Sequence, residues 1–334
     1  GGDLIIDSNF GSGGNVDISS AAALELGAIL QDVLDTVTIQ TTGVMTTGAN
    51  ISAGGDLVLS ANGITVSNLV SAKSMIFNSS TDYADTNQIG DAALVVNATG
   101  SVLTTTNGDL TLKAITMGDD GTSNVDVVVV GGHLNIDGDN ANGAGTIKIE
   151  SASALSLGTI VAEGADATTI IANANTLTTS ADIVTAGTLS LLGDGIIIAN
   201  NVTAKVLTVS SSSTDADQAD QALVVNNDKV LRTTAGAMTL KAVSILDDTA
   251  GVGEDVSVLV DGANNLVIAG GAGSDANNIK IHSTAALRLG DIAVDDNDTV
   301  AVTSDAGLSV QAAVTAGGLM TLQGKTGVHF AANT

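Results

Sequence analysis

Cysteine, proline and tryptophan are absent from this chain of 334 residues, and aromatic residues make up only 1% of it. Without cysteine there is neither a disulfide scaffold nor a thiolate metal site. Without proline every backbone N–H is available for a hydrogen bond, which suits strands that pair on both sides. A domain of this length normally packs its core around large aromatic side chains. The scarcity of aromatics therefore argues against an ordinary globular core.

The apolar material that is present consists of small and branched side chains. Hydrophobic residues reach 44% of the chain, and nearly all are Ala, Val, Ile or Leu. Such residues fit stacked strands around a thin, uniform interior. The 39 glycines, with many Asn, Asp, Ser and Thr residues, supply turn formers throughout the chain.

The formal net charge is −26, from 36 acidic and 10 basic residues. So acidic a surface repels nucleic acid and anionic lipid, so we expect neither as a partner. No apolar run approaches the length of about 18 residues that a membrane-spanning helix needs, and we expect no membrane insertion. The sequence opens at Gly1-Gly2 without an export signal, which we expect to lie outside it.

Self-similarity organises the chain. The segments that begin at Gly1, Gly131 and Asn264 align, so that Leu4, Leu134 and Leu266 correspond. Thr111-Leu112-Lys113-Ala114 also recurs unchanged at Thr239 to Ala242. We predict a superrepeat of about 131 residues, with unit 1 at 1–130, unit 2 at 131–263 and a partial unit at 264–334. The last unit stops without a cap, so we expect the sequence to be a window cut from a longer array.

Short alternating runs recur about every eight to twelve residues, with the period of two that is typical of strands. Segment 21–35 is an exception, because Leu26, Leu30, Val33 and Leu34 could share one face of a helix. The equivalent segments in the other copies have no helical character, so we predict a strand there as well.

Many short strands without helices are compatible with a sandwich, a barrel or a solenoid. No linker separates the copies, and a solenoid explains that continuity. We therefore predict an all-β fold, an elongated parallel β-helix (a β-solenoid) with roughly 20 residues per coil. Leu4, Leu134 and Leu266 should point inward, and Lys148 and Lys280 should point to solvent.

Three phrases carry a resemblance to a known family: GGDLVLSANGITVSNLVSAK, AGTLSLLGDGIIIANNVTAK and TNGDLTLKAITM. They resemble the haemagglutinin-type repeats of filamentous haemagglutinins and related autotransporter-like exoproteins. That resemblance implies an exported bacterial surface protein built as a parallel β-helix. The long superrepeat of this chain departs from the usual members.

Metal ligands are sought among the acidic loops. The segment from Gly270 to Asp275 fits the opening of a calcium-binding nonapeptide repeat, but that match stands alone. We expect these loops to be mainly solvated turns and name no firm metal site or cofactor. The weak calcium candidates are Asp137, Asp139, Asp275, Asp295, Asp296 and Asp298.

Catalytic candidates are weaker still. His133, His282 and His329 occupy three different phases of the repeat, so they are not expected to converge on one metal. Enzymes with a parallel β-helix that act on acidic polysaccharides need basic residues against the substrate, yet Arg232 and Arg288 are the only arginines and neither recurs. We name no catalytic residue and expect that the protein is not an enzyme.

The sequence thus favours a structural role at the cell surface, as the shaft of an extracellular fibre or adhesin. Self-association or continuation of the chain along the solenoid axis is the expected partner interaction, with host or cell-surface ligands as further partners. The first alternative is a self-assembling filament, sheath or surface-layer subunit. The second is a polysaccharide-processing enzyme.

Overall fold

The computed structural model describes residues 4–8, 15–31, 35–79, 93–97, 102–114, 116–118, 125–138, 146–162, 167–211, 222–226, 229–242, 244–247, 256–260, 266–270, 278–283, 286–293 and 299–331. They divide by packing into two compact units, Gly1–Ile170 and Ile171–Thr334. Strand β19 (Ala167–Thr179) contains the boundary. The repeat boundaries expected from the sequence stay a prediction.

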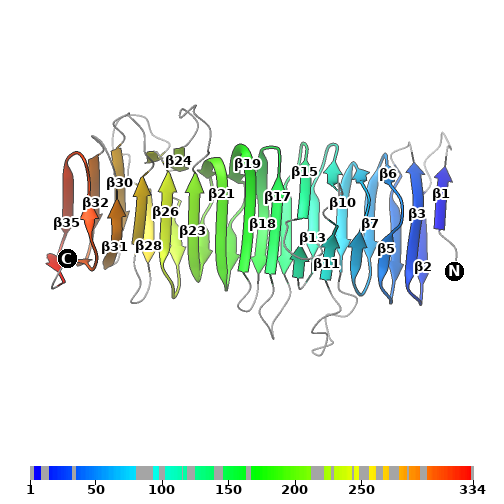
Figure 1. The fold of residues 1–334 in the computed structure, drawn as a ribbon, viewed down its shortest axis with the longest axis horizontal. Helices are drawn as coiled ribbons and strands as arrows, with labels where there is room; N and C mark the ends of the chain where they lie inside the picture. The colour runs from blue at the N-terminus through cyan, green and yellow to red at the C-terminus, as the bar shows by residue number, and fades with distance from the viewer. Residues whose placement is uncertain are drawn as a thin grey trace. The chain divides into compact units, whose positions relative to one another are not determined.

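Within unit 1 the strands form three stacks in which neighbours are parallel (Figure 1). The first stack contains β2 (Val16–Ser20), β4 (Val37–Thr41), β7 (Asp56–Ser60), β10 (Ser74–Asn78), β13 (Leu110–Lys113), β16 (Leu134–Gly138) and β18 (Leu155–Ala162). The second contains β5 (Met45–Thr47), β8 (Ile64–Val66), β11 (Ala93–Val96) and β14 (Thr116–Gly118). The third contains β6 (Ile51–Ala53), β9 (Val70–Ala72), β12 (Leu103–Thr105) and β15 (Val125–Val129).

Longer strands join the second and third stacks of unit 1. The first half of β3 (Leu24–Gln31) pairs with β5 and its second half pairs with β6, while β1 (Leu4–Ser8) pairs with β3 from the other side. At the other end of the stacks, β17 (Thr146–Ser151) pairs with both β14 and β15. A single strand can therefore pair with strands of two stacks.

Unit 2 repeats this architecture. Its first stack contains β21 (Thr188–Ile198), β23 (Val206–Ser211), β26 (Met238–Ala242), β29 (Leu266–Gly270) and β31 (Leu287–Ala293). The second half of β21 pairs with β24 (Ala222–Val225), and β24 pairs with β27 (Ser244–Asp247). The third stack contains β20 (Ile183–Thr185), β22 (Val202–Ala204), β25 (Leu231–Thr233), β28 (Val256–Val260), β30 (Asn278–Ser283), β32 (Thr299–Ser304) and β35 (Met320–Gly324). Strand β31 also pairs with β33 (Leu308–Val310) and β34 (Val314–Thr315), and β33 pairs with β36 (Val328–Phe330).

Each unit is thus an all-β parallel solenoid, and the predicted fold class is confirmed. Val16 pairs with Val37 and Val37 pairs with Leu57, so these three residues mark the same position on three successive coils. Segment 21–35, which could have been helical, contains strand β3, as predicted.

Alternation with a period of two builds the core. In β4, Val37 and Ile39 are fully buried, whereas Thr38 is partly exposed and Gln40 is exposed. The buried residues lie in register with those of the next coil, so Ile39 stacks on Leu59 and Leu59 on Phe77. Burial of each such aliphatic side chain contributes about 1.5–3 kcal/mol. Inward ladders of this kind replace the aromatic core that the sequence lacks.

The predicted orientations hold wherever the side chains are described. Leu134 and Leu266 are both 0% exposed. Lys148 is partly exposed and lies between Ile147 and Ile149, which are 0% exposed, so it points outward. The side chains of Leu4 and Lys280 lie outside the described residues.

A β-bulge occurs at the same motif in all three copies. The register shifts by one residue between Leu134/Leu157 and Ile136/Ile160, and the same shift occurs where β1 meets β3 and where β29 meets β31. The extra residue falls in the sequence Leu-Gly-x-Ile of each copy. In the second copy Asn135 Oδ1 accepts a hydrogen bond of 3.0 Å from the backbone N–H of Thr159. A bulge of this kind bends the strand locally and increases its twist.

Candidate functional site

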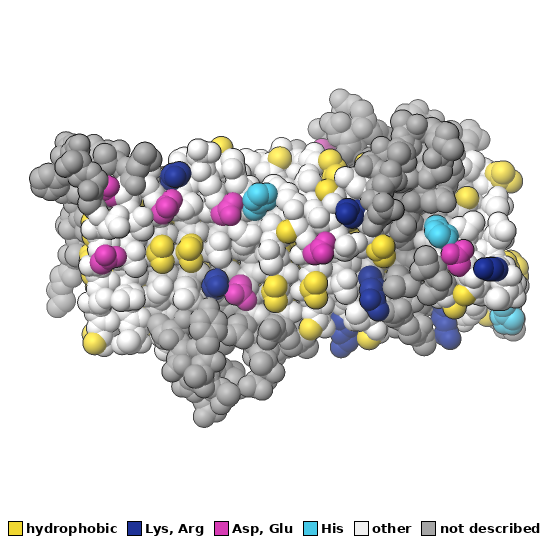
Figure 2. Space-filling view, turned by 180° about the vertical axis from the view of Figure 1, so that it is seen from behind, with side chains coloured by type: hydrophobic (Ala, Val, Ile, Leu, Met, Phe, Trp, Pro, Cys, Tyr) yellow, Lys and Arg dark blue, Asp and Glu magenta, His cyan; other side chains and the backbone are white. Residues whose placement is uncertain are grey.

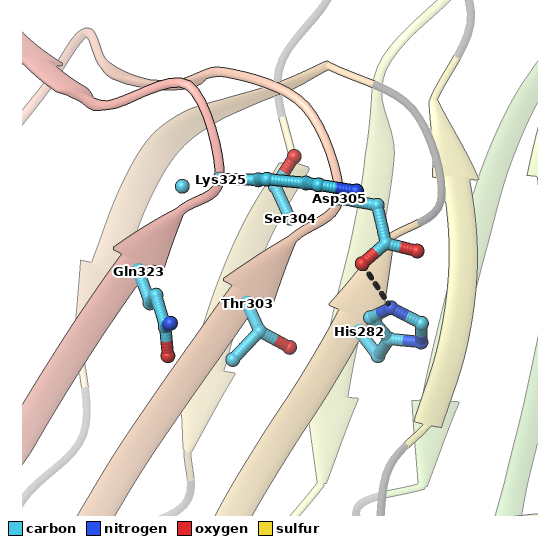
Figure 3. Close-up of a pocket in the computed structure, with 7 residues that line it drawn as sticks. His282, Thr303, Ser304, Asp305, Gln323 and Lys325 are labelled. Carbon is cyan, nitrogen blue, oxygen red and sulfur yellow. Dashed lines mark ion pairs between the residues drawn. The ribbon is translucent and has the colours of Figure 1, made fainter.

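A ladder of polar side chains lies on the outer surface of unit 2. His282 in β30 pairs in register with Thr303 in β32, and Thr303 pairs with Gln323 in β35. Figure 3 shows these side chains side by side on three consecutive strands. They line one side of a cavity of about 590 Å³. The parallel register places them together although a whole coil of chain separates each from the next.

Two stacked turns form the other side of this cavity. The backbone N–H of Asp305 donates to the carbonyl oxygen of Ser283 at 2.9 Å, and that of Lys325 donates to Ser304 at 2.9 Å. These bonds hold Asp305 and Lys325 at the ends of neighbouring strands. His282 Nε2 lies 3.3 Å from Asp305 Oδ1 (Figure 3). The cavity therefore presents a carboxylate, an imidazole and an ammonium group.

A second cavity of about 390 Å³ lies beyond the same turns. Arg288 in β31 pairs in register with Ser309 in β33, which pairs with His329 in β36, and all three line this cavity. Thr326 N–H donates to the carbonyl oxygen of Ala306 at 3.2 Å, which keeps the turns stacked between the two cavities.

We call the four basic residues around these cavities the basic corner: His282, Arg288, Lys325 and His329. The side chains of Arg288, Lys325 and His329 are exposed, and that of His282 is partly exposed. The lining of the two cavities contains one carboxylate, Asp305. Glycoside hydrolysis ordinarily uses a pair of carboxylates. The arrangement offers hydrogen-bond donors and positive charge, which suit binding.

Of the predicted calcium candidates, the structure describes Asp137 alone. Asp137 Oδ2 lies 3.3 Å from Lys113 Nζ, so this carboxylate already faces a cation. Asp139, Asp275, Asp295, Asp296 and Asp298 lie outside the described residues. Among the residues that the structure does describe, no group of three or more His, Cys, Asp or Glu side chains is arranged to hold a metal ion.

The three histidines lie in different surroundings. In unit 1, His133 Nδ1 lies 3.4 Å from Asp109 Oδ1, and Asp109 also accepts a hydrogen bond of 2.8 Å from the His133 backbone N–H. In unit 2, His282 and His329 lie on opposite sides of the stacked turns.

Sequence reasoning missed the basic corner because it compared histidines and arginines by their place in the superrepeat. Contact in a solenoid follows the length of a single coil instead. A local signal was present, since residues 306–334 contain Lys325 and His329 but no Asp or Glu. In a chain of net charge −26, such a segment stands out.

Elsewhere the described surface is mixed. On the face shown in Figure 2, hydrophobic side chains form small separate groups, and charged side chains of both signs lie scattered among polar ones. The most exposed large hydrophobic residues among those described are Leu319, Phe330 and Leu30, at 71%, 59% and 57%. The described residues include no helix that is long and apolar enough to span a bilayer.

The fold and the surface together define the chain as a β-solenoid repeat protein, consistent with β-helix repeat proteins in general. Comparison with known proteins finds no family model, no curated protein and no solved structure that matches it. The resemblance to haemagglutinin-type repeats therefore stays a prediction.

Proposed function

We propose that this chain is the non-catalytic structural shaft of an extracellular surface fibre or adhesin. The observation that carries the proposal is the parallel stacking of coil upon coil within each unit. Strand β7, for example, pairs with β4 on one side and with β10 on the other. A backbone ladder of this kind resists separation of the coils and builds length from a simple repeat.

Two further features support a structural role. Most buried side chains among the described residues are Val, Ile, Leu, Met or Ala, and the buried polar ones are Thr, Ser and Gln rather than charged groups. Many outward positions carry Ser, Thr, Asn or Asp, and the chain is strongly acidic, which favours solubility of a surface fibre.

Labelling of intact cells tests this proposal. An antibody raised against the chain should label the outside of unpermeabilised cells, and electron microscopy should show the label along filaments. Label that appears only after permeabilisation contradicts the surface location. A catalytic role is tested separately by incubating the purified chain with a panel of polysaccharides, and release of new chain ends would contradict the non-catalytic assignment.

A self-assembling filament subunit is the second candidate, and charge favours it. Residues 1–72 contain no Lys or Arg, whereas residues 306–334 contain no Asp or Glu. Strands β35 and β36 each pair with one neighbouring strand among those described, β32 and β33 respectively. Residues 1–72 of one copy therefore complement residues 306–334 of another in charge, and such complementarity favours association between copies.

Sedimentation over a range of protein and salt concentrations tests this candidate. Assembly that grows with protein concentration and weakens with salt is expected, because opposite charges are screened. Phe330 is 59% exposed in the last described strand, so Phe330→Ser should reduce assembly. Ile76→Ser is the matched control, since Ile76 is 38% exposed on a strand paired on both sides. A monodisperse monomer under all conditions would contradict self-assembly.

A further inference from the structure

We propose that the basic corner of unit 2 binds an acidic saccharide chain, with the carboxylate or sulfate groups of the saccharide against Arg288 and Lys325. This binding site is independent of the shaft function. The saccharide could belong to another surface or circulate freely, and the shared chemistry is an oxyanion carried on a hydroxyl-rich chain.

Charge is the first reason. The chain has ten Lys and Arg residues and three His residues against 36 carboxylates, yet Arg288, Lys325, His282 and His329 all line two neighbouring cavities. Neither Arg288 nor Lys325 forms an ion pair with a described carboxylate. A guanidinium group binds a carboxylate or a sulfate through two parallel hydrogen bonds, and an ammonium group adds a point charge.

Hydrogen-bonding character is the second reason, and it separates a saccharide from a polyphosphate. Thr303 and Gln323 offer both donors and acceptors in the first cavity, and Ser309 and Thr326 offer hydroxyls in the second. Asp305 would repel a densely charged phosphate chain, but its carboxylate accepts hydrogen bonds from sugar hydroxyls. A ligand with few charges and many hydroxyls therefore fits this mixed lining.

Nucleic acid fits less well for two reasons. Single-stranded nucleic acid is ordinarily held by aromatic stacking along a basic groove. The linings of the two cavities contain no Phe, Tyr or Trp, and their aromatic rings are the imidazoles of His282 and His329. The remainder of the acidic chain would also repel a polymer that carries one charge per nucleotide.

Shape is the third reason. The two cavities, of about 590 and 390 Å³, lie on either side of the stacked turns at 305–307 and 325–327. A small anion would occupy one of them. An extended ligand can cross the turns and place groups in both, so we expect affinity to rise with the length of the saccharide.

Calorimetric titration of the full chain tests the proposal. The probes are oligogalacturonate, which carries carboxylates, a sulfated oligosaccharide and a neutral oligosaccharide of the same length. Light scattering is recorded in parallel, so that any self-association is scored separately. At least one acidic saccharide should bind, and the neutral one should not. The double variant Arg288→Ala/Lys325→Ala should weaken binding by about tenfold or more, since it removes both charged hydrogen-bond donors that face the oxyanions.

A matched control variant distinguishes binding at the basic corner from a general effect of net charge. Arg232 and Lys241 are exposed on β25 and β26, outside both cavities, so Arg232→Ala/Lys241→Ala makes the same change of charge elsewhere in unit 2. This control should bind like the parent. The proposal is overturned if no acidic saccharide binds, or if the corner and control variants lose affinity equally. It is also overturned if polyphosphate or polyglutamate binds more tightly than either acidic saccharide.

Discussion

Gly132 lies against Gly108 of the neighbouring coil so closely that a Cβ on Gly132 would overlap the carbonyl group of Gly108. The contact joins two turns, in which the backbone N–H of Gly108 donates to Val130 at 3.0 Å. Both contacting groups are backbone, so neither can move aside without shifting a whole coil.

The first prediction is that Gly132→Ala destabilises unit 1 by about 1–3 kcal/mol, the range for overpacking a tight contact. The midpoint of urea denaturation measures it. Gly307→Ala is the control, because the nearest atom to its added Cβ is the rotatable hydroxyl of Thr326 at 3.3 Å. If both variants lost the same free energy of unfolding, the close contact between Gly132 and Gly108 would not be the reason why Gly132→Ala is destabilising.

The second prediction concerns Gln31, which is only 2% exposed and whose amide oxygen and nitrogen both lack a hydrogen-bond partner among the residues that the structure describes. A buried polar group without a partner costs about 1–3 kcal/mol. Gln31→Met keeps the approximate volume and removes the unpaired groups, so it should stabilise the protein by about that amount. Thermal denaturation measures the change.

Gln40 provides the control for Gln31. It is exposed, and its Nε2 donates to Ser19 Oγ at 2.7 Å. Gln40→Met should change the free energy of unfolding by less than about 0.5 kcal/mol, as for most surface substitutions. A destabilised Gln31→Met protein would mean that the amide is satisfied in solution.

The third prediction uses neighbours of opposite orientation. Ile147 is fully buried, whereas Lys148 is partly exposed. Ile147→Ala should destabilise the protein by about 2–5 kcal/mol through lost burial and a cavity, and Lys148→Ala by less than about 0.5 kcal/mol. Urea denaturation of both variants measures the difference. Comparable effects at the two positions would contradict the inward and outward assignment.

The fourth prediction is that chelating calcium leaves the melting temperature almost unchanged. Asp137 faces Lys113, and the sequence predicts that the other acidic candidates lie in solvated turns that need no metal. A large drop on adding chelator, reversed by calcium, would contradict this and would point to Asp139, Asp275, Asp295, Asp296 and Asp298.

The Lys113–Asp137 pair gives a companion measurement. Its side chains are 35% and 40% exposed, so solvent screens the attraction. Asp137→Asn should therefore destabilise the protein by no more than about 1 kcal/mol, with or without chelator. A loss that appears only when calcium is present would place a metal at Asp137.

The candidate site was less predictable than the fold. Alternation placed Leu134 and Leu266 in the core and Lys148 outside it, because the period of two depends only on local backbone geometry. The meeting of Arg288 with Ser309 and His329 depends on the lengths of two successive coils, and a loop of different length would change every such pairing.

The sequence by itself determined that this protein is a parallel β-solenoid. Its alternating apolar residues, its turn formers and the absence of proline leave few other ways to bury the apolar side chains. The tertiary structure alone decided which outward residues become neighbours. Outward side chains contribute little free energy through burial, so their positions follow no hydrophobic pattern from which their neighbours could be predicted. Their contacts follow from the register between coils, which the inward stacks and the bulge at Leu-Gly-x-Ile set.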